Sequence, residues 1–294
     1  MSIHFKLLVA TFVWGLTPTL GKILSTLEAP FIITFGRFFF ACLWLFAILL
    51  LRRKGQLVGR QFFVTFLVLG LTGIFLHNVL MYEGLEYISA STASLIFAFI
   101  VVQVAIIDSI INKKMPEKRS IVGMFFSVIG ILIVVTDGQI FTLPREELGW
   151  GAVLIFGSAF SWAVYTVVSR KALKTYSPLI VTTYASGVGL ILVAPFPLSY
   201  MEESIEIFSD AQSLLFLMFL GVVSSAITFI WHQQALAKIG ALSTSIYLNL
   251  VPIFGILSAA IILGENLNGF VLVGGFLVFF GIILVNTAPV SVDQ

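Results

Sequence analysis

Long apolar segments alternate with short polar connections along the whole chain. A membrane-spanning helix needs about 20 mainly apolar residues. These runs are continuous rather than alternating in polarity, which favours helices over a membrane barrel. We interpret the first segment as a retained helix rather than a signal peptide, because a second one follows at once. The pattern predicts an all-α integral membrane fold with ten transmembrane helices, at residues 7–25, 31–51, 62–82, 90–111, 120–137, 150–168, 179–198, 213–236, 242–263 and 270–286.

Basic residues gather in alternate connections between these segments. Connections 52–61, 112–119 and 169–178 carry most of the Lys and Arg, whereas stretch 202–210, on the other side, is acidic. Lys and Arg mark the cytoplasmic side of a membrane protein. The distribution therefore predicts that both termini are cytoplasmic.

The two halves of the chain resemble each other. Residues 66–134 align without a gap onto 217–285, and a slightly different shift places Trp14 on Trp162 and Pro30 on Pro178. Because each half holds five predicted helices, the second half enters the membrane from the opposite side. The sequence thus predicts two inverted five-helix repeats, at residues 1–138 and 149–288, which is a common architecture of secondary transporters.

Pairs of glycines recur at the same spacing in the fifth and tenth predicted helices. Gly123 and Gly130 are seven residues apart, as are Gly274 and Gly281. Seven residues are nearly two helical turns, so each pair lies on one helix face and permits close approach in lipid. We expect these two helices to pack rather than to line a site, with gating hinges as the alternative.

Composition narrows the class of protein. The chain is 59% hydrophobic and 10% charged, with a mean hydropathy of +1.10 and a net charge of +2. These values argue against an ordinary soluble enzyme, a disordered chain and a nucleic-acid-binding protein. Cys42 is the only cysteine, so no disulfide framework or thiolate metal site is expected. We found no phosphate-binding loop and no clustered acids or histidines, and we expect no enzyme activity, cofactor or metal.

Several motifs in order resemble a known family. These are Trp14-Gly15, Pro30, Arg37-Phe38, A-S-T-A-S-L-I at 90–96 and, in the second half, A-L-S-T-S-I-Y at 241–247, V-P-I-F at 251–254 and L-G-E at 263–265. Together they resemble the EamA-type transporters of the drug/metabolite transporter superfamily. The resemblance implies a ten-helix metabolite transporter, often an exporter, without an ATP-binding domain. The first half departs from the pattern, because Val101 stands where the second half has Pro252, which puts a symmetric kink in doubt.

Neutral polar and aromatic residues fall near the expected midplane of the membrane. Aromatic faces with scattered hydrogen-bonding groups suit an amphipathic or aromatic metabolite, or a cation over the rings. The alternative for the aromatic residues is anchoring at the membrane interface, which suits Trp44 and Trp150 better. The candidate substrate-binding residues of this kind are Trp14, Thr17, Gln103, Ser158, Trp162, Tyr165, Tyr247 and Asn249.

Ionisable residues within a span are costly and are candidates for a functional role. Arg37 suits a carboxylate substrate through its planar fork, with pairing to Glu83 or Glu28 as the structural alternative. His77, His232 and Asp108 are candidates for carrying a coupling proton. For the histidines the alternative is a bond to a neighbouring helix, and for Asp108 it is an interfacial ion pair near Lys113. We expect Glu265 to cap a turn at the outer side.

Together these features predict a secondary active transporter that exports small metabolites, such as amino acids or related amphipathic compounds, by alternating access. Proton coupling and uncoupled exchange are both compatible with the sequence. A flippase for lipid-linked head groups and a passive channel are the alternatives. We expect a multi-pass protein of a prokaryotic plasma (inner) membrane, a monomer or homodimer, with a small metabolite and the lipid bilayer as its partners and no nucleic acid.

Overall fold

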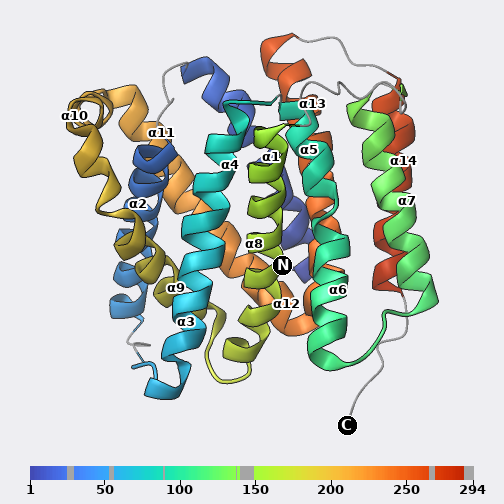
Figure 1. The fold of residues 1–294 in the computed structure, drawn as a ribbon, viewed down its shortest axis with the longest axis horizontal. Coiled ribbons are helices and arrows are strands. Elements are labelled where there is room, and N and C mark those ends of the chain that lie inside the picture. The colour runs from blue at the N-terminus through green and yellow to red at the C-terminus, as the bar shows by residue number, and fades with distance from the viewer. Residues whose placement is uncertain are drawn as a thin grey trace.

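A computed structural model describes residues 1–24, 30–52, 56–88, 90–136, 138–139, 149–264 and 269–287. Every regular element in these ranges is a helix, as the sequence predicts (Figure 1). The α-helices are α1 (Ile3–Leu24), α2 (Pro30–Leu51), α3 (Phe63–Leu69), α4 (His77–Leu85), α5 (Ala90–Ala98), α6 (Ile100–Asn112), α7 (Lys118–Val135), α8 (Trp150–Leu173), α9 (Pro178–Val193), α10 (Met201–Ser209), α11 (Ala211–Gly221), α12 (Thr228–Ser245), α13 (Val251–Leu263) and α14 (Phe270–Asn286).

Many of the helices are long and apolar enough to cross a membrane. Five stretches of the described chain meet this condition alone, and a sixth does if α9 and the segment after it, bent by 42°, form one span. The longest stretch, Ala211–Ile262, turns back at Gly240, whose φ of 81° and ψ of 175° are open to glycine but strained for other residues. The several apolar helices agree with a multi-pass membrane protein, and the count of ten spans stays a prediction.

Local sequence explains where helices α9 and α11 begin. The Ser177 side chain accepts a hydrogen bond from the Ile180 N–H, and Pro178 follows at the first helical position of α9. Asp210 caps α11 in the same way, accepting from the Ser213 N–H at 2.7 Å. This backbone hydrogen bond lowers the pKa of the Asp210 carboxyl.

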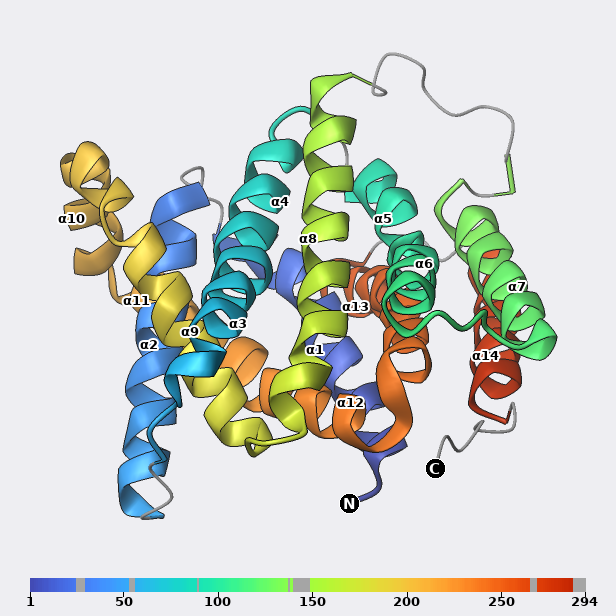
Figure 2. The ribbon, with the colours of Figure 1, turned by 60° about the horizontal axis from the view of Figure 1, so that its bottom comes forward.

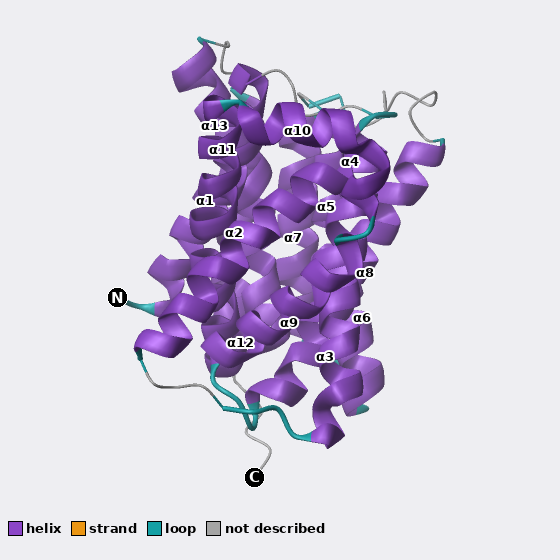
Figure 3. Cartoon of the chain, turned by 90° about the vertical axis from the view of Figure 1, so that its left-hand side faces the viewer, coloured by secondary structure: helices purple, strands orange, loops and turns teal. Residues whose placement is uncertain are grey.

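The two ends of the helical bundle carry connections of opposite charge. The turns that follow α6 and α8 carry Lys113 and Lys174 and lie together at one end, which we call the basic end (Figure 1). Helix α10, with Glu202 and Glu203, lies at the opposite, acidic end, where it runs across the bundle (Figure 3). The predicted sorting of charge to two sides of the molecule is therefore present in the described structure.

Helices α7 and α14 pack side by side at one edge of the molecule (Figure 2). An added Cβ on Gly123 would lie 2.8 Å from the Gly281 carbonyl oxygen, and one on Gly130 would lie 2.6 Å from that of Gly274. Gly123, early in α7, faces Gly281, late in α14, and Gly130 faces Gly274, so the two helices run antiparallel and their backbones are in contact. The prediction that these glycines serve close packing is confirmed.

The two halves share their irregular turns. Two π-helical segments, Gly70–Leu76 and Val222–Ile227, interrupt helices at positions related by the same offset as the sequence repeat. The break between α5 and α6 at Phe99 likewise matches the junction of Leu250 with α13. Both halves therefore interrupt their helices at equivalent places, although only the second half has a proline, Pro252, at this point.

Candidate functional site

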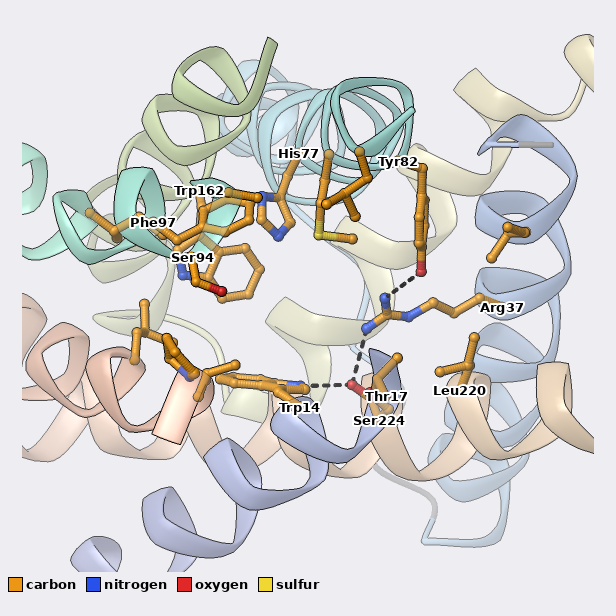
Figure 4. Close-up of a pocket in the computed structure, with 18 of the residues that line it drawn as sticks. Trp14, Thr17, Arg37, His77, Tyr82, Ser94, Phe97, Trp162, Leu220 and Ser224 are labelled. Atoms are coloured by element: carbon orange, nitrogen blue, oxygen red, sulfur yellow. Dashed lines mark hydrogen bonds between the residues drawn. The ribbon is translucent and has the colours of Figure 1, made fainter. Parts of the chain in front are cut away.

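A cavity of about 510 Å³ lies among α1, α2, α4, α5, α8, α11 and α13 (Figure 4). Its volume falls in the range of about 300–1,000 Å³ that small-molecule sites occupy. The wall is mostly apolar and rich in aromatic rings, which belong to Trp14, Phe97, Trp162, Phe216 and Phe229. A few polar side chains interrupt this wall, so the cavity suits a small molecule with an apolar body.

The cavity lies in the half of the bundle nearer the acidic end. Its lining residues in α2, Ile33 and Arg37, lie in the half of that helix nearer the acidic end, and those in α4 extend to Leu85 beside the same end. Residues near the basic turns, such as Tyr176, do not line it. The cavity is therefore one-sided in the sense that it lies toward the acidic end and does not extend to the basic turns.

Arg37 is the ionised side chain in the wall of this cavity, and it is 6% exposed. Its Nε donates to the Ser225 hydroxyl. One terminal nitrogen, Nη1, lies 3.1 Å from the Asn78 amide oxygen and 3.5 Å from the Tyr82 hydroxyl. The other, Nη2, donates to the Ser224 carbonyl at 3.2 Å (Figure 4). Each of these acceptors is uncharged.

Of the two carboxylate partners considered for Arg37, the structure describes only Glu83. Glu83 makes no ion pair with it, and Glu28 lies outside the described residues. The Arg37 Cζ also lies 5.5 Å from the centroid of the Phe38 ring. The side chain thus points into the cavity with its charge uncompensated by any carboxylate in the described part of the chain.

Two tryptophans from opposite halves of the chain meet at the cavity floor. The Trp14 and Trp162 rings are edge to face with centroids 6.0 Å apart, and Phe229 lies 5.3 Å from Trp162. The Trp14 indole N–H donates to the Ser224 carbonyl at 2.9 Å, so this oxygen joins the indole to Arg37. The predicted placement of both tryptophans at a cavity agrees with the structure, and it brings together residues 148 positions apart in sequence.

His77 stands beside this aromatic floor and is held by Ser158. The Ser158 hydroxyl donates to the His77 carbonyl at 2.7 Å, and the His77 Nδ1 lies 3.0 Å from that hydroxyl oxygen. The imidazole packs against Trp162 with centroids 4.7 Å apart. Ser158 therefore does not line the cavity but orients His77, which does. Thr17 and Asn249 also line the wall, as predicted from sequence.

Other predicted site residues lie beneath the floor rather than in the wall. The Tyr165 hydroxyl accepts from the Gln233 amide at 2.7 Å, and the Tyr247 hydroxyl bonds to the His4 ring at 2.6 Å. His232 packs 5.3 Å from Trp162, measured between ring centroids. Gln103 and His232 are buried, and the polar atoms of their side chains have no hydrogen-bond partner within the described ranges.

Asp108 lies away from the cavity, near the basic end. It forms an ion pair with Arg170 at 2.7 Å rather than with Lys113, which corrects the partner expected from sequence. Sequence proximity suggested Lys113, but that residue adopts a left-handed conformation that ends α6, and a neighbouring helix supplies the cation instead. Glu265, the predicted cap, lies outside the described residues.

Sequence reasoning missed the two serines that bind Arg37. Ser224 and Ser225 lie in the π-helical segment Val222–Ile227, whose wider turn leaves backbone carbonyls outside regular helical bonding. The first half has Gly73 and Ile74 at the equivalent positions, so the pair is not repeated. Arg37 and these serines are far apart in sequence, so no motif or spacing relates them. Their contact is visible only in the folded structure.

Comparison with known proteins identifies the family. The sequence model of the EamA-like transporter family matches residues 1–136 and 149–287. This chain belongs to that family, and it is a multi-pass membrane protein of a transporter class.

Named relatives agree with this assignment. The chain is 32% identical over 293 residues to the uncharacterized transporter YyaM of Bacillus subtilis strain 168, covering 96% of this chain and 93% of the relative. It is 26% identical over 219 residues to a probable terminal-alkyne amino-acid exporter of Streptantibioticus cattleyicolor, covering 74% of this chain and 71% of that protein. A solved crystal structure shares the fold, with a TM-score of 0.76, 16% identity, and coverage of 98% of this chain and 99% of that one.

Proposed function

We propose that this protein is a secondary transporter that moves small organic metabolites across a prokaryotic plasma membrane by alternating access. In this proposal ten helices form two inverted repeats, at residues 1–138 and 149–288, with the cavity between them. The basic end faces the cytoplasm, as the distribution of Lys and Arg predicts. The cavity then belongs to the outward-facing state.

The one-sided cavity is the observation that carries this proposal. A carrier exposes its site to one side at a time, so the other side must be sealed. The Trp14, Trp162 and Phe229 rings close the floor, and below them the Gln233 amide donates to the Tyr165 hydroxyl at 2.7 Å and to the Ser169 hydroxyl at 3.0 Å.

Further contacts between distant segments close the basic end. The Lys6 ammonium donates to the Gln234 amide oxygen, joining α1 to α12. The Gly59 N–H donates to the Tyr176 hydroxyl at 2.9 Å, joining the connection before α3 to the α8–α9 turn. These bonds are few and polar, so they are of a kind that can break when the molecule opens inward.

Buried polar groups beneath the floor support a second, inward-facing state. Gln103, Thr166, His232 and Ser245 have side-chain atoms that are buried without hydrogen-bond partners in the described structure. Leaving such groups unpaired costs free energy, about 1–3 kcal/mol each. Opening of the basic end would hydrate them, which partly offsets the loss of the sealing contacts.

The substrate class follows from the cavity and from a relative. A cavity of about 510 Å³ fits a small metabolite and is small for a lipid-linked head group. One relative is named a probable amino-acid exporter, and export of amino acids or related amphipathic compounds is the corresponding proposal here. His77 and His232 are the candidates for a coupling proton, with uncoupled exchange as the alternative.

Counterflow in proteoliposomes tests the carrier mechanism. A metabolite screen in cells that overexpress the protein first identifies a transported compound. Vesicles preloaded with that compound should then show saturable uptake of its labelled form, faster than empty vesicles. An imposed pH gradient changes the rate only if a proton is coupled. Linear flux without counterflow would contradict a carrier and indicate a channel.

A further inference from the structure

We propose that Arg37 forms an anion subsite that binds the carboxylate of an organic monoanion, whose apolar body lies against the Trp14–Trp162 floor. This inference rests on the proposed transport function and names its substrate class. It begins from one observation, a buried cation in the cavity wall whose hydrogen-bond acceptors among the described residues are all uncharged.

The charge of Arg37 requires compensation. A guanidinium stays protonated in proteins, so burial cannot neutralise it. A buried charge without a partner of opposite sign is expensive, and within a membrane protein such a group is a candidate for function. Since Arg37 is 6% exposed and pairs with no carboxylate in the ranges described, an anionic ligand is the partner that would compensate it.

The hydrogen bonds of Arg37 leave room for such a ligand. Nη2 carries two N–H groups and uses one on the Ser224 carbonyl, so the second has no acceptor among the described residues. The Tyr82 hydroxyl, 3.5 Å from Nη1, also lines the cavity and can donate its own proton. A carboxylate accepting from Nη2 and from Tyr82 would satisfy both donors with its two oxygens.

The apolar part of the ligand has a defined place beside this subsite. The Ser224 carbonyl accepts both from Arg37 and from the Trp14 indole, so the anion subsite and the aromatic floor adjoin. The described lining residues include no Asp or Glu, so an ammonium group would find no ion pair there. Among the amphipathic compounds of the proposed class, the site therefore favours a monoanion with an apolar or aromatic body over an unmodified amino acid, which is a zwitterion, and over an amine.

Three probes with one carbon skeleton test this preference. 3-Phenylpropionate carries only the carboxylate, phenylalanine carries carboxylate and ammonium, and phenethylamine carries only the ammonium. Binding to the purified full-length protein is measured by the ligand-induced shift in its thermal unfolding midpoint, and transport by counterflow in proteoliposomes. We expect apparent affinity to fall in the order 3-phenylpropionate, phenylalanine, phenethylamine.

Variants of Arg37 assign the preference to this side chain. Arg37→Gln should weaken 3-phenylpropionate binding at least about tenfold, because a charge-assisted hydrogen bond is lost, and should abolish the preference over phenethylamine. Arg37→Lys keeps the positive charge but loses the planar guanidinium. This variant should still prefer 3-phenylpropionate over phenethylamine, with a lower affinity for 3-phenylpropionate than the unaltered protein has. Arg170→Gln, which removes a cation outside the cavity, is the matched control and should bind as the unaltered protein does.

The possible results distinguish a failure of the anion subsite from a failure of the proposed transport function. Stronger binding of phenethylamine than of 3-phenylpropionate, no binding of any probe, or equal 3-phenylpropionate binding by Arg37→Gln would each overturn the subsite. If Arg37→Gln does not fold, the probe order in the unaltered protein and in Arg37→Lys decides. Arginine-dependent binding of 3-phenylpropionate without counterflow of any compound would leave the subsite standing and contradict the transport function instead.

Discussion

At the residue scale, Trp14 shows how the cavity combines packing with a polar contact. Its ring is edge to face with Trp162 and Phe229, and its indole N–H bonds to the Ser224 carbonyl at 2.9 Å. An aromatic pair contributes about 0.5–1.5 kcal/mol beyond its buried area, so the residue holds the floor in shape as well as offering a face to a ligand.

Truncation of this ring should impair transport more than folding. Trp14→Ala is expected to raise the KM for the transported compound about tenfold, through loss of ring contacts and of one hydrogen bond. Trp150→Ala is the matched control, because Trp150 is 63% exposed on the bundle surface, and it should leave transport unchanged. Equal KM values for both variants would remove Trp14 from the proposed substrate site.

Asp108 provides a contrasting case at the same scale. Its ion pair with Arg170 is partly exposed, with side-chain exposures of 26% and 38%, and pairs of this kind contribute about 0–1 kcal/mol. Asp108→Asn should therefore lower the unfolding midpoint only slightly and leave the pH profile of transport unchanged. A pH profile flattened by this substitution would make Asp108 a proton carrier after all.

At the element scale, irregular backbone positions the site. The π-helical segment Val222–Ile227 carries the serines that bind Arg37, and its counterpart Gly70–Leu76 precedes His77 on α4. Helices α7 and α14 stand apart from the cavity and contact each other through glycines. The irregular segments thus supply part of the site, together with the continuous helices α1, α2 and α8, whereas α7 and α14 pack outside it.

The glycine contact predicts a stability effect without a direct effect on the cavity. Gly130→Ala places a Cβ 2.6 Å from the Gly274 carbonyl oxygen, so the backbones must separate at a cost of roughly 1–3 kcal/mol. Gly187→Ala is the same change in α9, where the nearest atom lies 3.9 Å away, and it should not destabilise. Unfolding midpoints in one detergent compare the two, and equal midpoints would contradict close packing as the role of Gly130.

At the scale of the whole molecule, the charged connections and the cavity are arranged along the long direction of the helices. The basic turns lie at one end, and the cavity with α10 lies toward the other. In the proposed orientation the basic end is the cytoplasmic one, because Lys and Arg are retained on that side of a membrane.

Cysteine labelling checks this orientation. The only native cysteine is buried Cys42, so Cys42→Ala gives a background without thiols. In intact cells a membrane-impermeant maleimide should label Glu203→Cys at the acidic end and not Met115→Cys at the basic end. Permeabilised cells should show labelling of both, and the reverse pattern in intact cells would invert the proposed orientation.

The sequence by itself determined the helical membrane class, the sorting of charge and the close-packing role of the glycines in α7 and α14, but not that these two helices contact each other. These follow from local composition and from spacing along single helices, which need no knowledge of the partner helix. It also singled out Trp14, Trp162 and Arg37, because polar or aromatic groups are conspicuous inside apolar runs.

Only the tertiary structure decided what those residues face. The partner of Arg37 could not be read from sequence, because Ser224, Ser225 and Asn78 reach it through packing of separate helices and through a π-helical turn. The same holds for Asp108, which pairs with Arg170 across two helices rather than with nearby Lys113. Spacing along one chain defines a helix face, but the contact between two faces depends on how the helices pack.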